Sequence, residues 1–505
     1  MSGMHREIEA KYDAEPDLEL PELLGLPGVA AVEQPVEQHL SATYFDTADL
    51  RLARGGITLR RRTGGSDDGW HLKLPAAKDE RWEVTRALGR SARTVPKQLL
   101  DLVLVHSRGH TVAPVARLDT HRIVQRLLEA DAGVLAEIAD DHVSGEAFDD
   151  PITHTSWREL EVELVEGDRE LLAAAGEQLL AAGATPAGSA NKLARLLGGR
   201  IRRTAAPEPP TSRSSAGEVL TAHLVEQVDA LAAWDPGARQ DAPDALHKMR
   251  VATRRLRSAL ATYRPLLDRD VTEPLRAELK WLGEVLGEPR DAEVMHARLR
   301  DLVAAEPVVM VLGPVRRRID LELRARHRAG HGALLIELRG DRYFRLLDSL
   351  DELRAAPPVT DAARDPVGEV LPRLVRRTRK RVLRLARAAA DTESETEREH
   401  LLHEVRKAAK RYRYAGESVA PALGGKAATF ANRMEQLQEV LGEHQDSVVT
   451  REVLRELGVH AQLAGENGFS FGRLHGLEQC RGDQAKARYA DALAPIANKR
   501  PGWLS

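Results

Sequence analysis

The sequence predicts an α+β protein in which an N-terminal antiparallel β-barrel with flanking helices, residues 1–203, precedes an all-α domain, residues 216–505. In the first part, apolar residues mostly alternate with charged ones, which is the period of a half-buried strand. In the second part they recur every three or four positions, which is the period of an amphipathic helix. Residues 204–215 between them include Pro-Glu-Pro-Pro and several small polar residues, so an exposed linker is expected there.

Length and composition are those of a globular protein with more than one domain. The chain has 505 residues, and one hydrophobic core stops growing at about 250–300. The single cysteine, Cys480, cannot form an internal disulfide. No apolar leader follows Met1 and no run of about 18 apolar residues occurs, so no membrane partner is expected and the expected location is the cytoplasm.

The net charge of −3 conceals two halves of opposite sign. Residues 1–210 carry 25 Lys and Arg against 34 Asp and Glu, a balance of −9, which leaves +6 for residues 211–505. An acidic half with clustered basic residues suits a metal-dependent site, and a basic half suits a polyanionic partner.

The first strand, His5–Tyr12, presents two carboxylates and an ammonium on one face, because Glu7, Glu9 and Lys11 alternate with apolar residues. Carboxylates held this close repel one another unless a cation lies between them, and hard divalent ions such as Mg²⁺ or Mn²⁺ prefer oxygen ligands. The pattern indicates a metal-and-phosphate site. A solvated strand face of alternating charge has the same pattern.

Basic residues mark the next strands. Arg60 and Arg62 share one strand face, a hairpin turn is expected at Gly64–Gly69, and Lys73 lies on the returning strand. A helix is expected near 95–106. Further strands are expected around Ala113–Arg117, His121–Leu128 and Gly133–Asp141.

The last strand, Trp157–Leu164, places Glu159, Glu161 and Glu163 on one face. Three carboxylates in a row disfavour mutual ionisation, so cations should face them. With the basic strands, this is the inventory of a closed antiparallel barrel whose polar lumen could clamp a triphosphate between cations and carboxylate-held metal. A surface of mutually paired charges would give the same alternation. The basic residues concerned are Arg60, Arg62, Lys73, Arg122 and Lys192.

Several of these stretches resemble, in order, the motifs of the CYTH superfamily, the triphosphate tunnel metalloenzymes. They are Glu7-Ile-Glu-Ala-Lys11, Tyr44-Phe-Asp46, Leu59-Arg-Arg-Arg62, Leu72-Lys73, Glu159-Leu-Glu-Val-Glu163 and Ser189-Ala-Asn-Lys-Leu-Ala-Arg195. The resemblance covers most of residues 1–203. It implies an antiparallel tunnel that hydrolyses or cyclises triphosphates with Mg²⁺ or Mn²⁺.

The resemblance also implies roles for single residues. Metal would be held by Glu7, Glu9, Glu159 and Glu161, with Glu163 and Asp141 as supporting acids. Phosphates would be bound by Lys11, Arg60, Arg62, Lys73, Arg122 and Lys192. The catalytic group would consist of Glu7, Glu9, Lys11 and Glu161.

The second half contains an internal repeat. His247–Arg257 recurs as His403–Arg413 with an offset of 156, and Leu282–Asp291 recurs as Leu437–Asp446 with an offset of 155. Two tandem copies, about 216–365 and 366–505, are therefore predicted, each as a four-helix bundle.

Each copy aligns a histidine with three cations on one helix face, at positions i, i+3, i+7 and i+10. A lone stripe of this kind would repel itself, so an opposing acidic helix or a bound polyanion should compensate its charge. The two stripes could face each other across a cleft; a solvated charged face is the alternative. A further basic row includes Arg376 and Lys380. Asp291 and Asp446 are expected to hold the motif helices by salt bridges or caps. The stripes are His247, Arg250, Arg254 and Arg257, and His403, Arg406, Lys410 and Arg413.

This half resembles the CHAD domain, a histidine-containing helical domain often found beside CYTH domains. The resemblance implies inorganic polyphosphate as the ligand, bound by Lys and Arg along a basic channel. Hydrogen bonding of His247 and His403 to phosphate is favoured over metal binding, because the neighbouring arginines repel a metal cation.

The leading hypothesis is a cytoplasmic, metal-dependent triphosphatase joined to a polyphosphate-binding module, with inorganic triphosphate or a polyphosphate end as substrate. One alternative is an adenylate cyclase of the class IV type. A second is a non-catalytic adaptor that binds polyphosphate granules. Nucleic acid is disfavoured as a partner, because an aromatic content of 4% offers few platforms for base stacking.

Overall fold

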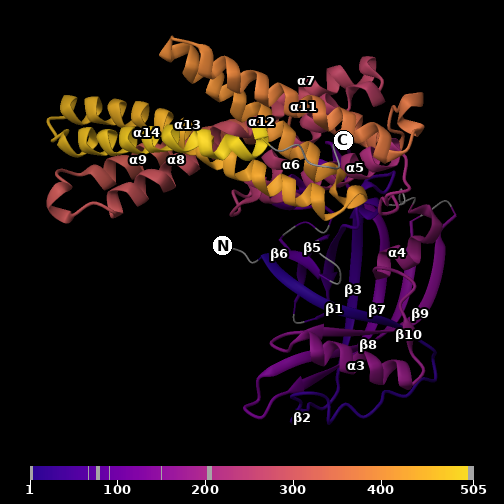
Figure 1. The fold of residues 1–505 in the computed structure, drawn as a ribbon. Helices are drawn as coiled ribbons and strands as arrows, with labels where there is room; N and C mark the ends of the chain where they lie inside the picture. Colours follow the sequence, from indigo (N-terminus) through magenta and orange to yellow (C-terminus); the bar gives the residue numbers. More distant parts are fainter. Residues whose placement is uncertain are drawn as a thin grey trace. The chain divides into compact units, whose positions relative to one another are not determined.

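The computed structural model describes residues 4–65, 67–75, 80–89, 91, 93–148, 151–201 and 207–498. The chain forms two compact units, Met1–Thr204 and Ala205–Ser505. The first holds all the described strands, and the second is helical (Figure 1). The order predicted from the sequence, antiparallel strands followed by helices, is confirmed. Residues 202–206, which include the first three residues of the predicted linker, lie outside the described residues.

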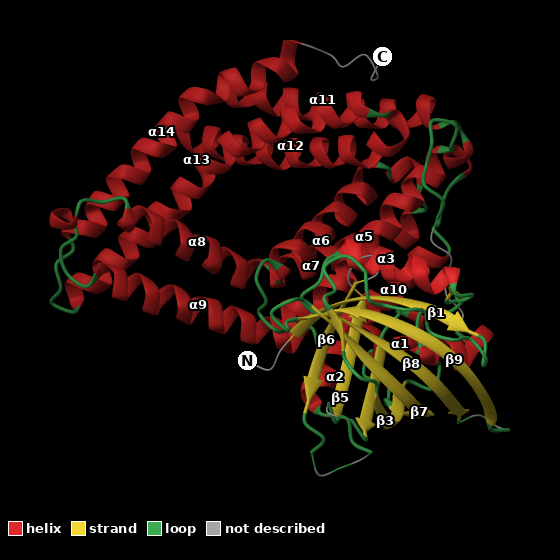
Figure 2. Cartoon of the chain, turned by 90° about the horizontal axis from the view of Figure 1, so that it is seen from below, coloured by secondary structure: helices red, strands yellow, loops and turns green. Residues whose placement is uncertain are grey.

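One antiparallel sheet builds the first unit, with the strand order β10-β1-β6-β5-β4-β3-β7-β8-β9, and β2 beside β7 (Figure 2). Among the described residues, β1 pairs with β6 through Met4–Ile8 and with β9 through Glu9–Ala14, and the sheet is tunnel-like rather than a fully closed barrel. The strands are β1 Met4–Ala14, β2 Ala31–Val32, β3 Val36–Asp46, β4 Thr58–Thr63, β5 Gly69–Pro75, β6 Glu80–Arg86, β7 Ala113–Leu128, β8 Val134–Ala147, β9 Thr153–Leu164 and β10 Thr185–Pro186.

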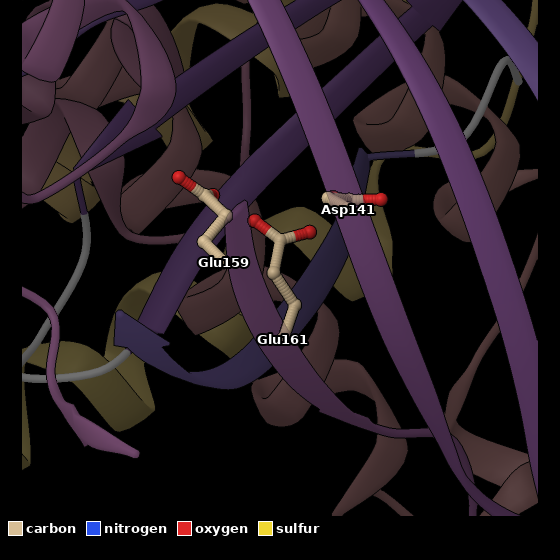
Figure 3. Close-up of side chains that lie close together, drawn as sticks. All are labelled: Asp141, Glu159 and Glu161. Atoms are coloured by element: carbon tan, nitrogen blue, oxygen red, sulfur yellow. The ribbon is translucent and has the colours of Figure 1, made fainter. Parts of the chain in front are cut away.

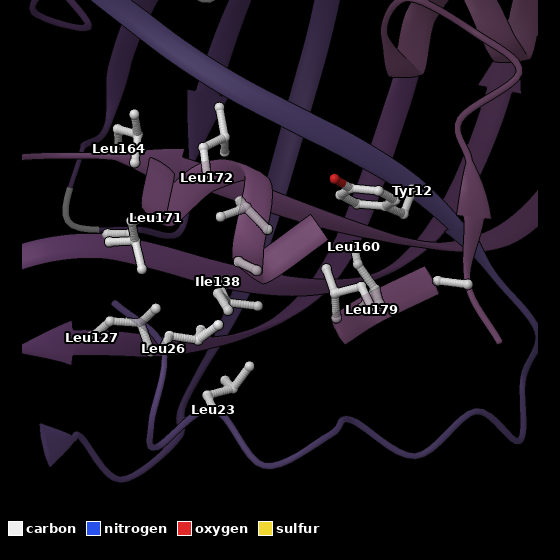
Figure 4. Packing of buried hydrophobic residues seen from close by; sticks show 14 residues of the cluster. Tyr12, Leu23, Leu26, Leu127, Ile138, Leu160, Leu164, Leu171, Leu172 and Leu179 are labelled. Carbon is white, nitrogen blue, oxygen red and sulfur yellow. The ribbon is translucent and has the colours of Figure 1, made fainter. Parts of the chain in front are cut away.

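Helices cover the apolar face of this sheet and so turn its charged face inward. α3, Arg169–Ala181, packs Leu171 and Leu179 against Tyr12 and Leu160 in one buried cluster (Figure 4). A Cβ at Gly176 would lie 2.2 Å from the Tyr12 hydroxyl, so a glycine is needed where α3 crosses β1. The other helices of this unit are α1 Arg51–Arg54, α2 Lys97–Ser107 and α4 Lys192–Leu197.

Two predicted strands, at 113–117 and 121–128, are one continuous strand, β7. The charged pair Arg117 and Asp119 interrupts the apolar pattern, but the two side chains pair with each other on the exposed face. Between them, Leu118 stays buried opposite Ala42 of β3 and Gly145 of β8. Backbone pairing on both edges therefore carries the strand through the charged stretch.

The second unit consists of ten described helices. No helix in the described part of the chain is long and apolar enough to cross a membrane. The helices are α5 Ala216–Arg239, α6 Ala245–Thr262, α7 Arg269–Val285, α8 Gly287–Ala304, α9 Val315–Glu337, α10 Asp341–Ala355, α11 Val367–Asp391, α12 Glu395–Leu423, α13 Gly425–Leu463 and α14 Phe469–Asn498.

The prediction of two separate four-helix bundles is not confirmed. The first copy breaks at Leu286 into α7 and α8, whereas the equivalent stretch of the second copy runs unbroken as α13. One buried cluster joins Leu299 of α8 and Ile319 of α9 to Leu457 of α13 and Leu474 of α14. Helices of the two copies thus bury their apolar faces against each other, as the adjoining ribbons of α8, α9, α13 and α14 show (Figure 1).

Candidate active site and polyanion-binding helices

A polar cavity of about 270 Å³ lies inside the sheet of the first unit. It is lined by ten of the residues proposed from the sequence, which come from β1, β4, β5, β7, β9 and α4. They are Glu7, Glu9, Lys11, Arg60, Arg62, Lys73, Arg122, Glu161, Glu163 and Lys192.

Strand register sets which of these charges meet. β1 and β9 place Lys11 opposite Glu161 and Glu9 opposite Glu163. Directly opposed side chains on one face have Cβ atoms about 4.5–5.5 Å apart, so each pair can interact. Lys11 forms ion pairs with both Glu161 and Glu9, the latter at 2.9 Å between Nζ and Oε2.

One acidic wall is formed by Glu7, Glu9 and Glu163. Lys73 Nζ lies 2.6 Å from Glu7 Oε2, yet burial still raises the pKa of Glu7. Burial and the neighbouring Glu7 and Glu9 raise the pKa of Glu163 to about 7. This wall carries more carboxylates than its cations neutralise, and its donors are all oxygens, so the residues present fit a hard divalent cation.

A second acidic group consists of Asp141, Glu159 and Glu161, whose side chains lie close together (Figure 3). One carboxylate oxygen from each lies within 4.8 Å of the others. Lys192 Nζ stands 2.8 Å from Asp141 and 2.7 Å from both Glu159 and Glu161. Burial opposes the charge on this ammonium, but the three carboxylates outweigh it and raise the pKa of Lys192.

Arg122 and Trp157 complete the pairing of this second group. Arg122 donates to both oxygens of Asp141, at 2.7 and 2.6 Å, and to Glu161 at 2.7 Å. Trp157 Nε1 donates to Glu159 at 2.6 Å. Three carboxylates therefore face three cations, since Lys11 also pairs with Glu161. The metal ligands proposed from sequence thus divide: Glu7, Glu9, Glu161 and Glu163 line the cavity, whereas Asp141 and Glu159 do not. Of the four that line it, Glu161 is already neutralised by its cation partners.

A basic wall, formed by Arg60 and Arg62 of β4, contributes to the same cavity. Burial and the neighbouring Arg60 and Arg122 lower the pKa of Arg62 to about 9, although Asp67 pairs with Arg62. In the described part of the chain, the Nε atoms of Arg60 and Arg62 are buried without a hydrogen-bond partner. A wall of this kind is stabilised by an anion that accepts from the guanidinium groups.

Sequence reasoning gave no role to several cavity residues. The hydroxyl of Tyr44 accepts from Arg60 at 3.4 Å. Glu83 lies opposite Lys73 across β5 and β6 and binds His71 at 2.9 Å. The alternation of side chains on β6 could have indicated that Glu83 faces the cavity. The strand register that brings Glu83 close to Lys73 and Glu7 cannot be predicted from the sequence.

In the second unit, the two stripes share one local structure. Arg250 of α6 donates to Asp291 at 2.6 Å and passes 3.2 Å from where a Cβ would stand on Gly287. The second copy repeats this arrangement. Arg406 of α12 lies 3.8 Å from Asp446 and 3.3 Å from the corresponding position on Gly442. The repeated Leu-Gly-Glu motif therefore makes room for an arginine, and the aspartates hold the motif helices as expected.

The stripes of α6 and α12 lie within electrostatic range of each other. Burial together with Arg406, Arg254 and Arg250 lowers the pKa of Lys410 to about 7. The Nε atoms of Arg254 and Arg406 are buried without a hydrogen-bond partner among the described residues. Cations from both copies thus gather at one place where protein carboxylates do not balance them.

Both stripe histidines are half-buried. Burial and nearby arginines lower the pKa of His247, and burial with Lys407 lowers that of His403. Both shifts favour the neutral imidazole, which can hydrogen-bond. His403 Nδ1 lies 3.0 Å from Gln445 Oε1.

Three of the proposed polyphosphate residues lie apart from this group. Arg413 pairs with Glu417 at 2.7 Å and with Glu435 at 2.8 Å. Arg376 is half-buried and Lys380 is exposed, on the face of α11 opposite its buried residues. The structure does not bring them to the Arg250–Lys410 group.

Comparison with known proteins identifies both units. Residues 5–197 match the family model of the CYTH domain, and residues 222–455 match that of the CHAD domain. The uncharacterized protein Rv2226 of Mycobacterium tuberculosis H37Rv is 39% identical, over 97% of this chain and 96% of its own.

Two solved structures are also similar. The CHAD domain from the plant Ricinus communis is 21% identical, over 59% of this chain and 97% of its own, with a TM-score of 0.47. A putative adenylyl cyclase from Hippeastrum, HpAC1, described as having a dominant triphosphatase activity, is 16% identical, over 39% of this chain and 97% of its own, with a TM-score of 0.25. From the two domain matches and the full-length relative, the chain belongs to the family of proteins in which a CYTH domain is followed by a CHAD domain.

Proposed function

We propose that the CYTH tunnel hydrolyses inorganic triphosphate or the end of a polyphosphate chain with Mg²⁺ or Mn²⁺, and that the CHAD domain binds inorganic polyphosphate. The observation that carries the enzymatic part is one cavity that combines an acidic wall, fit for a divalent cation, with a basic wall, fit for phosphates. Neither wall alone would suffice, since phosphoryl transfer needs both the metal and charge-matched positioning.

Glu7, Glu9 and Glu163 would hold the metal, because they line the cavity and leave negative charge unbalanced. Glu161 lines the same cavity and would join them from its ion pairs with Lys11, Arg122 and Lys192. A divalent ion bound there supplies charge neutralisation at the phosphoryl group and an activated water. Asp141 and Glu159 would act indirectly, by holding the ammonium group of Lys192 in position at the cavity edge.

The phosphates would be held by the cavity cations. Arg60 and Arg62 offer paired guanidinium groups, which suit the spaced oxygens of a phosphate chain. The cavity lining supports an inorganic substrate, because Tyr44 is its only aromatic residue among those described and Leu40 and Val124 are its only large apolar ones. A nucleobase would find little surface to stack on. The cations concerned are Lys11, Arg60, Arg62, Lys73, Arg122 and Lys192.

The adenylate cyclase alternative differs in the attacking group, which would be a ribose hydroxyl rather than water. Incubation of the full-length protein with Mg²⁺ and either ATP or tripolyphosphate separates the two, with cyclic AMP and orthophosphate as readouts. We expect orthophosphate from tripolyphosphate and no cyclic AMP. Cyclic AMP as the main product would overturn the proposal. No turnover of either substrate would favour the granule-binding adaptor.

Polyphosphate binding by the CHAD domain is supported by the cations that α6 and α12 bring together, which a polyanion would neutralise. Such binding would place the protein at polyphosphate granules in the cytoplasm. The ligand would accept hydrogen bonds from Arg250, Arg254, Arg406 and Lys410, with His247 and His403 at the ends of the stripes.

Polyphosphate affinity is expected to fall by about tenfold between pH 7 and pH 9, because Lys410 loses its proton over this range. The pKa of Lys410 is about 7 in the free protein, held down by burial and by Arg406, Arg254 and Arg250, with Asp446 opposing them. A bound polyanion favours the ammonium, so binding above pH 7 takes up a proton. Titration calorimetry at several pH values measures both effects.

Lys410→Arg is the matched control, because a guanidinium keeps its charge over this range. It should bind polyphosphate with an affinity that no longer depends on pH between 7 and 9. If this variant shows the same pH dependence as the wild type, Lys410 is not the group that titrates.

A further inference from the structure

The two copies contribute equally to the α6–α12 pair, yet its two flanks differ in charge. The repeat offset of 156 makes Arg255 equivalent to Arg411 and Arg257 equivalent to Arg413. Each flank thus carries one arginine from each copy. We name the flank of Arg255 and Arg413 the paired flank, and that of Arg257 and Arg411 the cationic flank.

On the paired flank, Glu417 bridges both arginines. Its Oε2 lies 2.8 Å from Arg255 Nη2, and its Oε1 lies 2.7 Å from Arg413 Nε. Glu435 adds a second contact to Arg413 at 2.8 Å. Two arginines therefore face two carboxylates, and this flank has no net charge to offer a ligand.

On the cationic flank, the position equivalent to Glu417 is Ala261. Among the described residues, no carboxylate lies within ion-pair distance of Arg257 or Arg411. Burial lowers the pKa of Arg411, and the positive charges of Arg381, Arg276 and Arg257 lower it further. One repeat position, Glu in the second copy and Ala in the first, thus separates the two flanks.

The carboxylates that act on this flank are Glu284 on Arg257, Glu404 on Arg411 and Glu273 on Arg276, and each is shared with another cation. Glu284 lies 3.6 Å from Lys280. Glu273 pairs with Arg276 at 2.6 Å and also with Arg264 at 2.8 Å. Glu404 lies 3.9 Å from Arg381 and 2.9 Å from Lys407. The flank therefore retains positive charge from α6, α7, α11 and α12 together.

The cationic flank is continuous with the group of Arg250, Arg254, Arg406 and Lys410, which we call the central group. Arg254 lies one helical turn from Arg257 on α6, and its charge acts on both Arg257 and Lys410. A phosphate chain in the central group would meet further donors in one direction only. In the other direction it would meet Glu417.

We propose that polyphosphate leaves the central group over the cationic flank alone, so that Arg257, Arg276, Arg381 and Arg411 form a second binding segment and Glu417 closes the opposite path. This inference rests on polyphosphate binding by the CHAD domain, as proposed above. It assigns binding to Arg411 and removes it from Arg413.

The test compares Arg411→Ala with Arg413→Ala in the full-length protein, because these residues are of one type, two positions apart, on opposite flanks. Long-chain polyphosphate should bind Arg411→Ala about five- to tenfold more weakly, with a salt dependence flatter by roughly 0.7–0.9 in log–log slope. The affinity of Arg413→Ala should stay within about twofold of the wild type, since Arg413 is already ion-paired with Glu417.

Glu417→Gln provides the converse, because it frees Arg255 and leaves Arg413 with Glu435 as its carboxylate partner, and it should tighten binding severalfold. Arg411→Lys retains the charge and should retain the salt slope. Should Arg411→Ala fail to fold, Arg381→Ala tests the same segment from an exposed position on α11, with an expected loss of about threefold.

Arg254→Ala separates failure of this inference from failure of the function on which it rests. If Arg254→Ala weakens binding while Arg411→Ala and Arg381→Ala do not, the one-sided path is wrong and the central site stands. Equal losses for Arg411→Ala and Arg413→Ala would also overturn the one-sided path. A wild-type protein that does not bind polyphosphate would overturn the proposed function itself.

Discussion

Replacing Glu7 and Glu9 together by glutamine is expected to lower kcat/KM for tripolyphosphate by at least about a thousandfold. Both side chains line the cavity, and glutamine keeps their shape while removing the charge that would hold the metal. Lys73 would lose its ion pair with Glu7, and Lys11 would keep only its pair with Glu161, so substrate affinity should not fall in parallel. Steady-state orthophosphate release at saturating Mg²⁺ measures the effect.

Glu15→Gln is the matched control for this double variant, because Glu15 is an exposed carboxylate just beyond β1. It should turn over tripolyphosphate like the wild type. Polyphosphate binding should be unchanged in both variants, since the CHAD cations do not involve β1. Activity of the Glu7 and Glu9 double variant within about threefold of the wild type would remove these residues from the metal site.

Replacing Lys192 by methionine is expected to destabilise the CYTH domain by about 3–5 kcal/mol at pH 7, because two buried carboxylates, Asp141 and Glu159, and the half-buried Glu161 lose a shared partner. Burial opposes ionisation of Asp141 and Glu161, but Lys192, Arg122 and, for Glu161, Lys11 hold their pKa values below the ordinary range. These two carboxylates stabilise the fold fully at pH values above their pKa in the unfolded chain. The stabilisation is lost as the pH falls through their lower pKa in the folded protein. The deficit of the variant should therefore shrink as the pH falls below about 4.

Hydrogen exchange of β8 and β9 peptides at pH 7 measures this loss locally, which avoids assuming that a two-domain chain unfolds in one step. Lys97→Met, an exposed lysine at the start of α2, is the control and should change exchange little. Adding Glu159→Gln to Lys192→Met should recover part of the loss. A cost below about 1 kcal/mol for Lys192→Met would show that the group is solvated rather than buried.

Sequence alternation predicted which charges share a strand face, and the cavity confirms this for Glu7, Glu9 and Lys11 and for Arg60 and Arg62. It could not predict strand register, which depends on pairing between distant segments. Register brings Lys11 to Glu161 and Glu83 to Lys73. It also places Asp141 and Glu159 against Lys192 rather than in the open cavity, a division that no local pattern reveals.

The helical repeat could be predicted from the sequence because its motifs keep their spacing. The two stripes lie close together in the structure. The repeat pattern does not predict how the two copies pack against each other. Helical periodicity marks an apolar face without naming its partner, so the burial of Leu299 against Leu457 across the copies could not be read from either one. For the same reason Arg413 was grouped with the binding cations, although Glu417 and Glu435 neutralise it.

The central claim is that one chain carries a metal-dependent phosphohydrolase site and a separate polyanion site made of cations. One preparation of the full-length protein tests it, with orthophosphate release from tripolyphosphate and binding of long-chain polyphosphate measured before and after EDTA, and again after Mg²⁺ is restored. We predict that EDTA reduces release to background, that Mg²⁺ restores it, and that polyphosphate binding is unchanged throughout. Release that persists in EDTA, or release and binding that are lost together, would contradict the account.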